Sequence, residues 1–148
     1  MAAWIRVDMC RCGDDHTLVL LRNGHVFVMG ANQCGQLGLG DSIDRGVPTP
    51  LVFFSDEHIA DVAAAANGTL ALTNAGKVYT FGNSETDTGC RLPRHVYTLP
   101  KSDPIVAITK DCAFEYAISD TGNFFRWASS DTNWDGDGKK EAESFHAI

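Results

Sequence analysis

One fourteen-residue pattern occurs three times along this chain of 148 residues, each time without an internal gap. Each copy reads as a short strand, a tight turn that ends in glycine, and a second strand. The copies are TLVLLRNGHVFVMG (17–30), TLALTNAGKVYTFG (69–82) and EYAISDTGNFFRWA (115–128), at a near-constant period of about 50 residues. An isolated hairpin is marginally stable at best in water, so we expect the copies to pack on one another.

The turns and the apolar positions of these copies indicate stacked β-sheets. Gly24, Gly76 and Gly122 supply the positive φ that tight turns need, and the dipeptide Asn23-Gly24 favours a type I′ turn. Residues 18–21 are apolar on both faces of their strand, and such a sheet must be covered on both faces. Stacked sheets satisfy this requirement. A single antiparallel sandwich whose hairpins are alike by chance is the alternative.

A further strand is expected before each hairpin. Apolar residues gather at 5–9, 59–62 and 105–108. The alanine-rich run at 61–66 has helical propensity, but Asn67-Gly68 ends it at once, and its alignment with the first copy favours a strand. Because no stretch has a sustained period of 3.6 residues, the predicted fold class is all-β.

The charge balance narrows the classes of partner. Lys and Arg number 12 against 19 Asp and Glu, which gives a formal net charge of −7. A phosphate backbone or an anionic membrane requires a positive surface, so we expect neither nucleic acid nor membrane as a partner. The N-terminal segment MAAWIRVDMCRC resembles neither a signal peptide nor a membrane span and makes a weak transit peptide.

The five cysteines indicate a reducing compartment. Cys10, Cys12, Cys34, Cys90 and Cys112 form no CxxC pair, and an odd number cannot all pair with one another. We therefore expect an intracellular protein, cytoplasmic or nuclear, with an organelle as the open alternative. A zinc site that combines these thiols with His16 or His25 is a second alternative, but no standard ligand spacing supports it, and we expect no metal.

The first copy and its flanks carry a family resemblance. Residues 12–18 read CGDDHTL, residues 23–27 read NGHVF, and residues 30–41 read GANQCGQLGLGD. In this order, and continuing through Pro48 and Pro50, these motifs closely resemble the regulator of chromosome condensation repeat. The second and third copies resemble it less closely, because the second lacks the glycine-rich segment and the third has Ala128 in place of the second strand's last glycine.

The resemblance implies a β-propeller blade of four antiparallel strands, usually one of seven in a ring. We therefore expect a partial β-propeller of about three antiparallel blades, in an RCC-type repeat region at residues 1–128. Its units cover about 5–54, 59–100 and 105–128, and an acidic, Gly- and Asp-rich C-terminal segment follows at 129–148. The expected structural glycines are Gly24, Gly76, Gly122, Gly30, Gly82, Gly35, Gly38 and Gly40.

The glycine-rich segment at 30–41 raises the question of nucleotide binding. It lacks the Lys-Ser/Thr pair that completes a P-loop, and no strand-to-helix unit surrounds it as in a dinucleotide fingerprint. In the family that this chain resembles, the segment is a structural turn between strands. We therefore expect no cofactor here.

Three other features are candidate sites. Residues 131–137 fit the first half of a calcium loop, but Ala142 stands where the bidentate glutamate belongs, so a solvated acidic turn is favoured. His16 has no nucleophile at a useful spacing, and the resemblance implies a packing role for it. Trp4 and Trp134 lie outside the hairpins and are candidate interface anchors. No catalytic residue is expected.

Three blades are fewer than the roughly four to eight of a closed propeller. The leading hypothesis is a non-enzymatic protein–protein interaction subunit that other chains complete or cap. The alternative is a part of a guanine-nucleotide exchange factor for a small GTPase, which the resemblance implies for some family members. A fragment or short form whose other blades lie elsewhere is a third reading. We expect each end of the stack to expose apolar side chains: Val19, Leu21, Phe27 and Met29 at one end, or Phe125 and Trp127 at the other.

Overall fold

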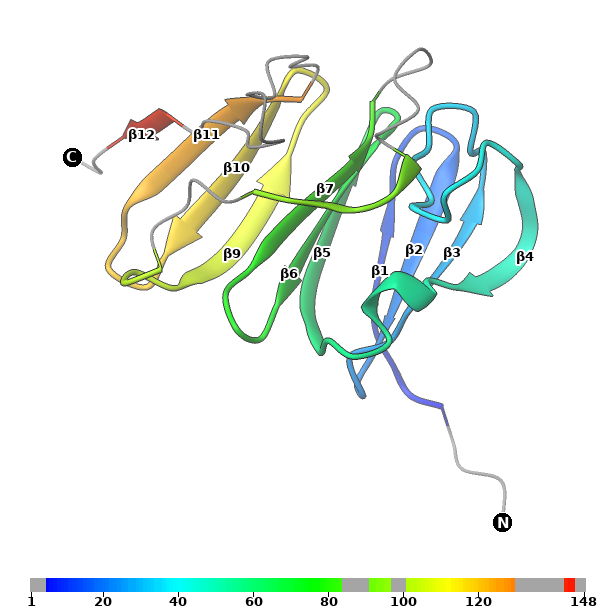
Figure 1. Cartoon of the computed structure of the whole chain (residues 1–148), viewed down its shortest axis with the longest axis horizontal. Helices are drawn as coiled ribbons and strands as arrows, with labels where there is room; N and C mark the ends of the chain where they lie inside the picture. The colour runs from blue at the N-terminus through cyan, green and yellow to red at the C-terminus, as the bar shows by residue number, and fades with distance from the viewer. Residues whose placement is uncertain (1–4, 84–90, 97–100, 130–142, 146–148) are drawn as a thin grey trace.

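The structure, a computed structural model, describes residues 5–83, 91–96, 101–129 and 143–145. They form three four-stranded antiparallel sheets, which lie side by side in chain order (Figure 1). The first sheet contains β1 (Val7–Cys12), β2 (His16–Leu21), β3 (Val26–Gly30) and β4 (Arg45–Pro50). The second contains β5 (Ile59–Ala65), β6 (Gly68–Thr73), β7 (Val78–Gly82) and β8 (Arg94–His95), and the third contains β9 (Ile105–Lys110), β10 (Phe114–Ser119), β11 (Phe124–Ala128) and β12 (Glu143–Phe145).

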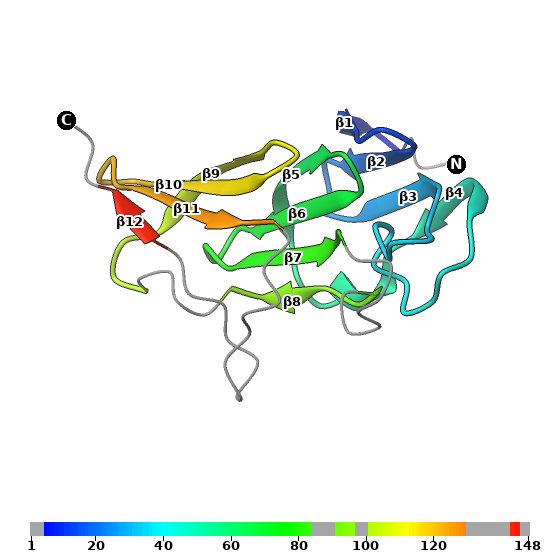
Figure 2. The same cartoon turned by 90° about the horizontal axis from the view of Figure 1, so that it is seen from above.

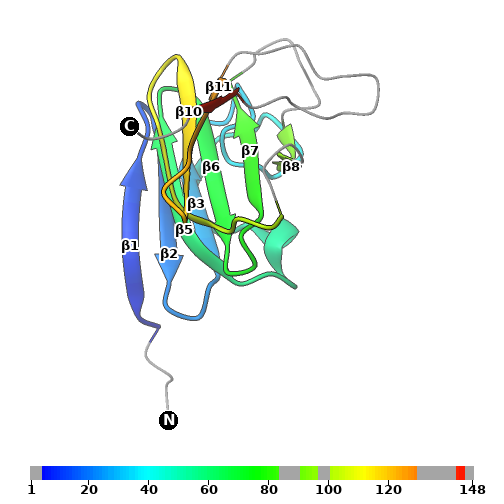
Figure 3. The same ribbon diagram turned by 90° about the vertical axis from the view of Figure 1, so that its left-hand side faces the viewer.

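Each sheet is one antiparallel meander, with its strands in sequence order and no crossover. A short 3₁₀ turn, η1 (Val52–Phe54), joins the first sheet to the second. The sheets stack face to face like the blades of a fan (Figures 2 and 3). We call them the first, second and third blade. The all-β class and the partial propeller are therefore confirmed.

The three predicted hairpins are present and share one register. In the first blade His16 pairs with Gly30, and the pairing runs to Leu20 and Val26. The same offsets recur from Gly68–Gly82 to Leu72–Val78 and from Phe114–Ala128 to Ile118–Phe124. The alanine-rich run is a strand, as expected, because β5 pairs with β6 along its length.

The turns of these hairpins differ from the predicted type I′ geometry. The Gly24 amide donates to the Leu21 carbonyl and the Leu21 amide donates to the His25 carbonyl, so three residues form the loop. Gly24 has φ +83°, whereas Asn23 is not among the described residues with positive φ, as a type I′ turn would require. The loop is instead a type I turn closed by a left-handed glycine, and Gly76 and Gly122 repeat it at φ +78° and +87°.

The third blade extends past the boundary expected at residue 128. Its fourth strand, β12, pairs with β11 through Arg126 and Glu143 and lies within the segment that the sequence sets apart as 129–148. In the first blade the fourth strand is β4, which follows the glycine-rich segment and includes two prolines. Proline is tolerated there because β4 is at the edge of its sheet.

Every blade packs with the same polarity. We call the side of the first blade that carries Leu18, Leu20, Val26 and Val28 its forward face, and the side that carries Val19, Phe27 and Met29 its back face. The forward face of the first blade packs on the second blade's back face, which includes Val62, Ala71 and Phe81. The second blade's forward face, with Leu70, Leu72 and Val78, packs on the third blade's Ala117, Phe125 and Trp127.

Candidate interaction surfaces

The contact between the first and second blades has a buried polar centre. His16 is 2% exposed, and its Nε2 lies 2.9 Å from the Thr69 hydroxyl. That hydroxyl donates its proton to the Gln36 carbonyl at 2.8 Å, so it accepts from His16, and the imidazole proton resides on Nε2. No described group bonds to Nδ1. Burial, and secondarily the charge of Lys110, lowers the pKa of His16 to about 4, against the raising effect of Asp14 and Asp15.

The contact between the second and third blades holds a buried carboxylate instead. Glu115 stands at the repeat position of Thr69 and is fully buried. It accepts hydrogen bonds from the Thr80 hydroxyl at 2.8 Å and from the Trp127 indole. The Lys110 ammonium lies 3.7 Å from it, and both side chains are inaccessible to solvent. One repeat position thus carries the polar contact with the preceding blade in both interfaces.

The glycine-rich segment uses its own amides for packing. The amides of Cys34 and Leu37 donate to side-chain oxygens of Gln36 and Asn32. The amides of the glycines at 35, 38 and 40 donate to the carbonyls of residues 32, 35 and 91, the last of these in the second blade. A phosphate site needs free amides that converge on one point, and these amides already have protein acceptors. The segment thereby joins the first blade to the second.

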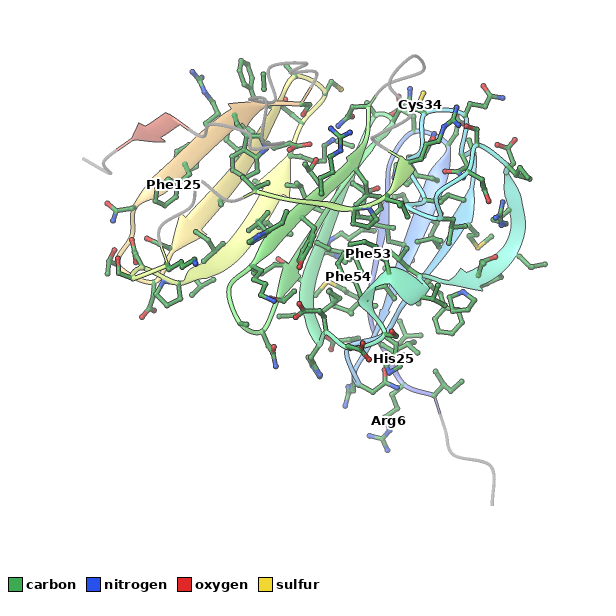
Figure 4. All side chains as sticks on the ribbon, in the orientation of Figure 1. Arg6, His25, Cys34, Phe53, Phe54 and Phe125 are labelled. Carbon is green, nitrogen blue, oxygen red and sulfur yellow. The ribbon has the colours of Figure 1, made fainter. Side chains whose placement is uncertain are left out.

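Aromatic side chains cover the outer junction of the first two blades (Figure 4). Phe53 and Phe54, both in η1, lie with ring centroids 5.9 and 5.0 Å from that of Tyr79 in β7. Phe54 is buried, whereas Phe53 is 43% exposed and Val52 is 70% exposed. This cluster is not among the predicted sites, although the adjacent Val-Phe-Phe after a proline-containing strand is a visible signal in the sequence.

The back face of the first blade is uncovered. Its strand β1 is exposed at every position except Met9, which is half-buried. Cys10 and Cys12 are exposed, whereas Val62 and Ile108, at the repeat position of Cys10, are 2% and 8% exposed. Val19, Phe27 and Met29 are half-buried, as expected for this end, but Leu21 is buried.

The uncovered face of the third blade is not the one expected from the sequence. Phe125 and Trp127 are 6% and 3% exposed because they are on the back face, which packs on the second blade. The forward face, on which no described blade packs, carries Phe114, Tyr116, Ile118, Phe124 and Arg126. The Tyr116 and Phe124 rings are 5.5 Å apart, and the Arg126 guanidinium lies 4.5 Å from the Phe114 ring centroid.

Several predicted site residues fall outside the described residues. Trp4, Trp134, Cys90 and the calcium-loop segment 131–137 are among them. Within the described ranges, no group of three or more His, Cys, Asp or Glu side chains is placed to hold a metal ion. Over the same ranges, no helix has the length and apolarity needed to cross a membrane.

Known proteins resemble this chain in sequence and in fold. The family model of the Regulator of chromosome condensation (RCC1) repeat matches residues 23–72. The human X-linked retinitis pigmentosa GTPase regulator is 40% identical over 88 residues, which are 58% of this chain and 9% of that protein. The ultraviolet-B receptor UVR8 of Arabidopsis thaliana is 44% identical over 78 residues, which are 53% of this chain and 18% of the receptor. The chain thus spans less than a fifth of each of these relatives.

Two solved structures share the fold. Human WBSCR16 superposes with a TM-score of 0.77 and 25% identity, over 86% of this chain and 34% of its own. Prp20p of Saccharomyces cerevisiae superposes with a TM-score of 0.70 and 20% identity, over 83% of this chain and 33% of its own. Three consecutive blades, the family model that matches across the first two, and these likenesses lead to one assignment. The chain carries an RCC1 repeat at residues 23–72 and folds as a partial β-propeller of the RCC1 type.

Proposed function

We propose that this chain is a non-enzymatic, intracellular interaction subunit whose end blades are covered by other protein chains. The observation that carries the proposal is the exposure of the first blade's back face. The repeat position of Cys10 is buried by a neighbouring blade in the second and third blades and is open in the first. Complete burial of a Val, Phe or Met side chain contributes about 1.5–3 kcal/mol to stability. A face that leaves several such side chains uncovered therefore loses several kcal/mol of possible stabilisation.

A protein partner fits these surfaces better than a small molecule does. The open faces include half-buried Val, Met, Phe and Tyr side chains, and aromatic residues and Met are enriched in protein interfaces. The two polar groups at the centres of the blade contacts, His16 and Glu115, are buried and already hydrogen-bonded. A stable interface on either end would bury more than about 1,000 Å² in total.

The test is the state of the chain in its native particle. Light scattering should give a mass well above the 16.0 kDa of one chain, with a second protein present. In that particle Cys10 and Cys12 should react more slowly with iodoacetamide than in the isolated chain, while Cys112, exposed in the turn before β10, keeps its rate. A native monomer in which both thiols react freely would contradict the proposal.

A small GTPase is the second candidate for the partner class. The name of the human relative, a GTPase regulator, favours it. Such a partner would be bound by surface contact, and the chain would accelerate nucleotide release without forming a covalent intermediate. The measurement is the release of a fluorescent guanine nucleotide from a panel of small GTPases. If a saturating concentration of the chain does not accelerate nucleotide release, the exchange activity is contradicted, while the interaction function stands.

A further inference from the structure

We propose that the back face of the first blade accepts one particular kind of partner: a further RCC1-type blade that carries a histidine at the position of His16. This inference rests on the proposed function, which does not specify the partner, and it states which partner covers the first blade. It also excludes the third blade of a second copy as the partner, so the chain should not form head-to-tail rings with itself.

The first step is that the residue at one back-face position, that of Thr69 and Glu115, matches the residues of the preceding blade. At this position the second blade has Thr69, which contacts His16 and the Gln36 carbonyl of the first blade. The third blade has Glu115 there, which contacts Thr80 and Asn83 of the second blade. Threonine therefore matches a blade with the histidine and the glycine-rich segment, and glutamate matches a blade that lacks both.

The second step is that the first blade carries threonine at this position. Thr17 pairs with Met29 and Cys12 in the register that places Thr69 opposite Phe81 and Ala64. It is half-buried, and the hydrogen-bond partner described for its hydroxyl is the Cys12 thiol at 3.7 Å. The Thr17 hydroxyl is thus placed to accept from an imidazole Nε2–H and to donate to a carbonyl of the preceding blade, as Thr69 does.

The third step concerns size. Val19 stands where the other back faces have Ala71 and Ala117, so the first blade's back face has less room for its neighbour. The forward face that packs on Ala71 consists of Leu and Val side chains. A face of this kind can still approach Val19, whereas additional bulk would force side chains out of their rotamers.

The third blade's forward face fails both requirements. Phe114 stands at the repeat position of His16, so it offers no imidazole to Thr17. Tyr116 and Phe124 replace Leu18 and Val26, which adds aromatic bulk opposite Val19. Arg126 replaces Val28 and would bring a guanidinium into an apolar contact. The third blade of a second copy therefore does not complement the first blade.

The experiment uses the full chain with one additional blade. In the tandem variant, residues 1–58 precede residues 7–148, so the added blade enters through the connection that naturally joins the first blade to the second. Cys10→Ser and Cys12→Ser in the added copy leave these two thiols only on the original first blade. Their iodoacetamide alkylation is followed by mass spectrometry, with Cys112 as the internal reference.

The expected result is that alkylation of Cys10 and Cys12 slows roughly tenfold or more relative to Cys112, as local protection by a packed neighbour requires. In the matched variant, His16→Phe in the added copy alone introduces the residue of the third blade, and the protection should be lost. Equal protection with phenylalanine, or protection in the unextended chain that rises with its concentration, would overturn the proposal.

A second measurement keeps the proposal falsifiable if the added blade does not fold. A photoreactive maleimide is attached to Cys10, the labelled chain is assembled into the native particle, and the cross-linked partner peptide is sequenced. The proposal requires that peptide to belong to an RCC1-type repeat with a histidine immediately before the Thr17-equivalent position. A cross-link to an unrelated protein would overturn this inference while the interaction function stands, whereas no cross-link at all would contradict the proposed function itself.

Discussion

At the residue scale, the buried His16 links the stability of the blade stack to pH. Its neutral form holds Thr69 through Nε2–H, and a second proton would place a buried charge on Nδ1. Asp14, Asp15 and Lys110 are the charged groups whose fields act on it, and burial outweighs the two carboxylates. Because the pKa of His16 is lower in the folded state than in the unfolded state, the unfolded chain binds a proton more readily. Acid therefore favours unfolding.

The pH dependence of unfolding tests this directly. The His16 contribution is complete above pH 6.5, the pKa of an unperturbed histidine, and is lost as the pH falls toward 4, the folded value. Between pH 7.5 and 4.5 this one group should remove roughly 2–3 kcal/mol, since each pKa unit is about 1.4 kcal/mol. Urea denaturation of the wild type and of His16→Gln at both pH values isolates the effect, because glutamine does not titrate. An equal pH dependence in the two proteins would contradict it.

Two glycines with the same backbone conformation should respond differently to alanine. Gly82 and Gly122 have φ +85° and +87°, so Gly122→Ala, with open space around it, should cost only the backbone strain of about 1–2 kcal/mol. At Gly82 an added Cβ would lie 2.3 Å from the Asn67 carbonyl oxygen and 2.9 Å from the Gln36 Cα of the first blade. Gly82→Ala should therefore cost about 1–3 kcal/mol more. Chemical denaturation gives both values, and similar costs would show that the blades can move apart without penalty.

At the scale of the strands, the second interface depends on a charge pair that the sequence alone does not reveal. Lys110 is the last residue of β9 and Glu115 is the second residue of β10. A short turn brings them together in the contact between the second and third blades. Breaking a buried pair leaves one charge uncompensated and costs about 3–5 kcal/mol, whereas removing both charges costs less than the sum.

A double-mutant cycle measures that coupling. Lys110→Met and Glu115→Gln should each destabilise the chain by about 3 kcal/mol or more, and the double variant should be less destabilised than the sum by at least about 1 kcal/mol. Thr80 and Asn83 retain their bonds to the residue at 115 in the Lys110 variant. That variant also loses the hydrogen bond from Lys110 Nζ to Asn83 Oδ1, and the cycle removes this loss from the coupling because it occurs in both variants without Lys110. If the destabilisation of the double variant equals the sum of the two single variants, the charge pair contributes no coupling. The effect of Glu115 then comes from its hydrogen bonds to neutral donors.

The same scale shows which features local sequence can predict. The hairpins and their left-handed glycines follow from residues adjacent in the chain, and these predictions were correct. The turn type was wrong because Asn-Gly suits both a two-residue and a three-residue loop. The exposure of Phe125 and Trp127 was wrong because alternation along a strand defines two faces without saying which one meets the neighbouring blade. The Lys110–Glu115 pair and β12 depend on contacts between segments, for which the repeat pattern carries no signal.

At the scale of the whole molecule, the stack has a direction. A back face meets a forward face at each internal contact, so the two ends of the chain's three blades present different surfaces. One end carries Thr17 and Val19, and the other carries an aromatic layer with Arg126 above Phe114. The partners at the two ends should therefore differ, and the protection of Cys10 and Cys12 described above reports on the first blade's end alone.

The uninterrupted order of strands within each sheet also has a genetic consequence. Because a blade is one contiguous stretch of about 50 residues, a single duplication or deletion adds or removes a complete blade without breaking another sheet. Selection on a new copy then acts through its neighbours, since Thr69 must suit His16 in the blade before it and Glu115 must suit Thr80. Substitutions should covary between residues about one repeat apart in the chain, and a blade transplanted between relatives should retain its fold only beside a neighbour with the matching residues.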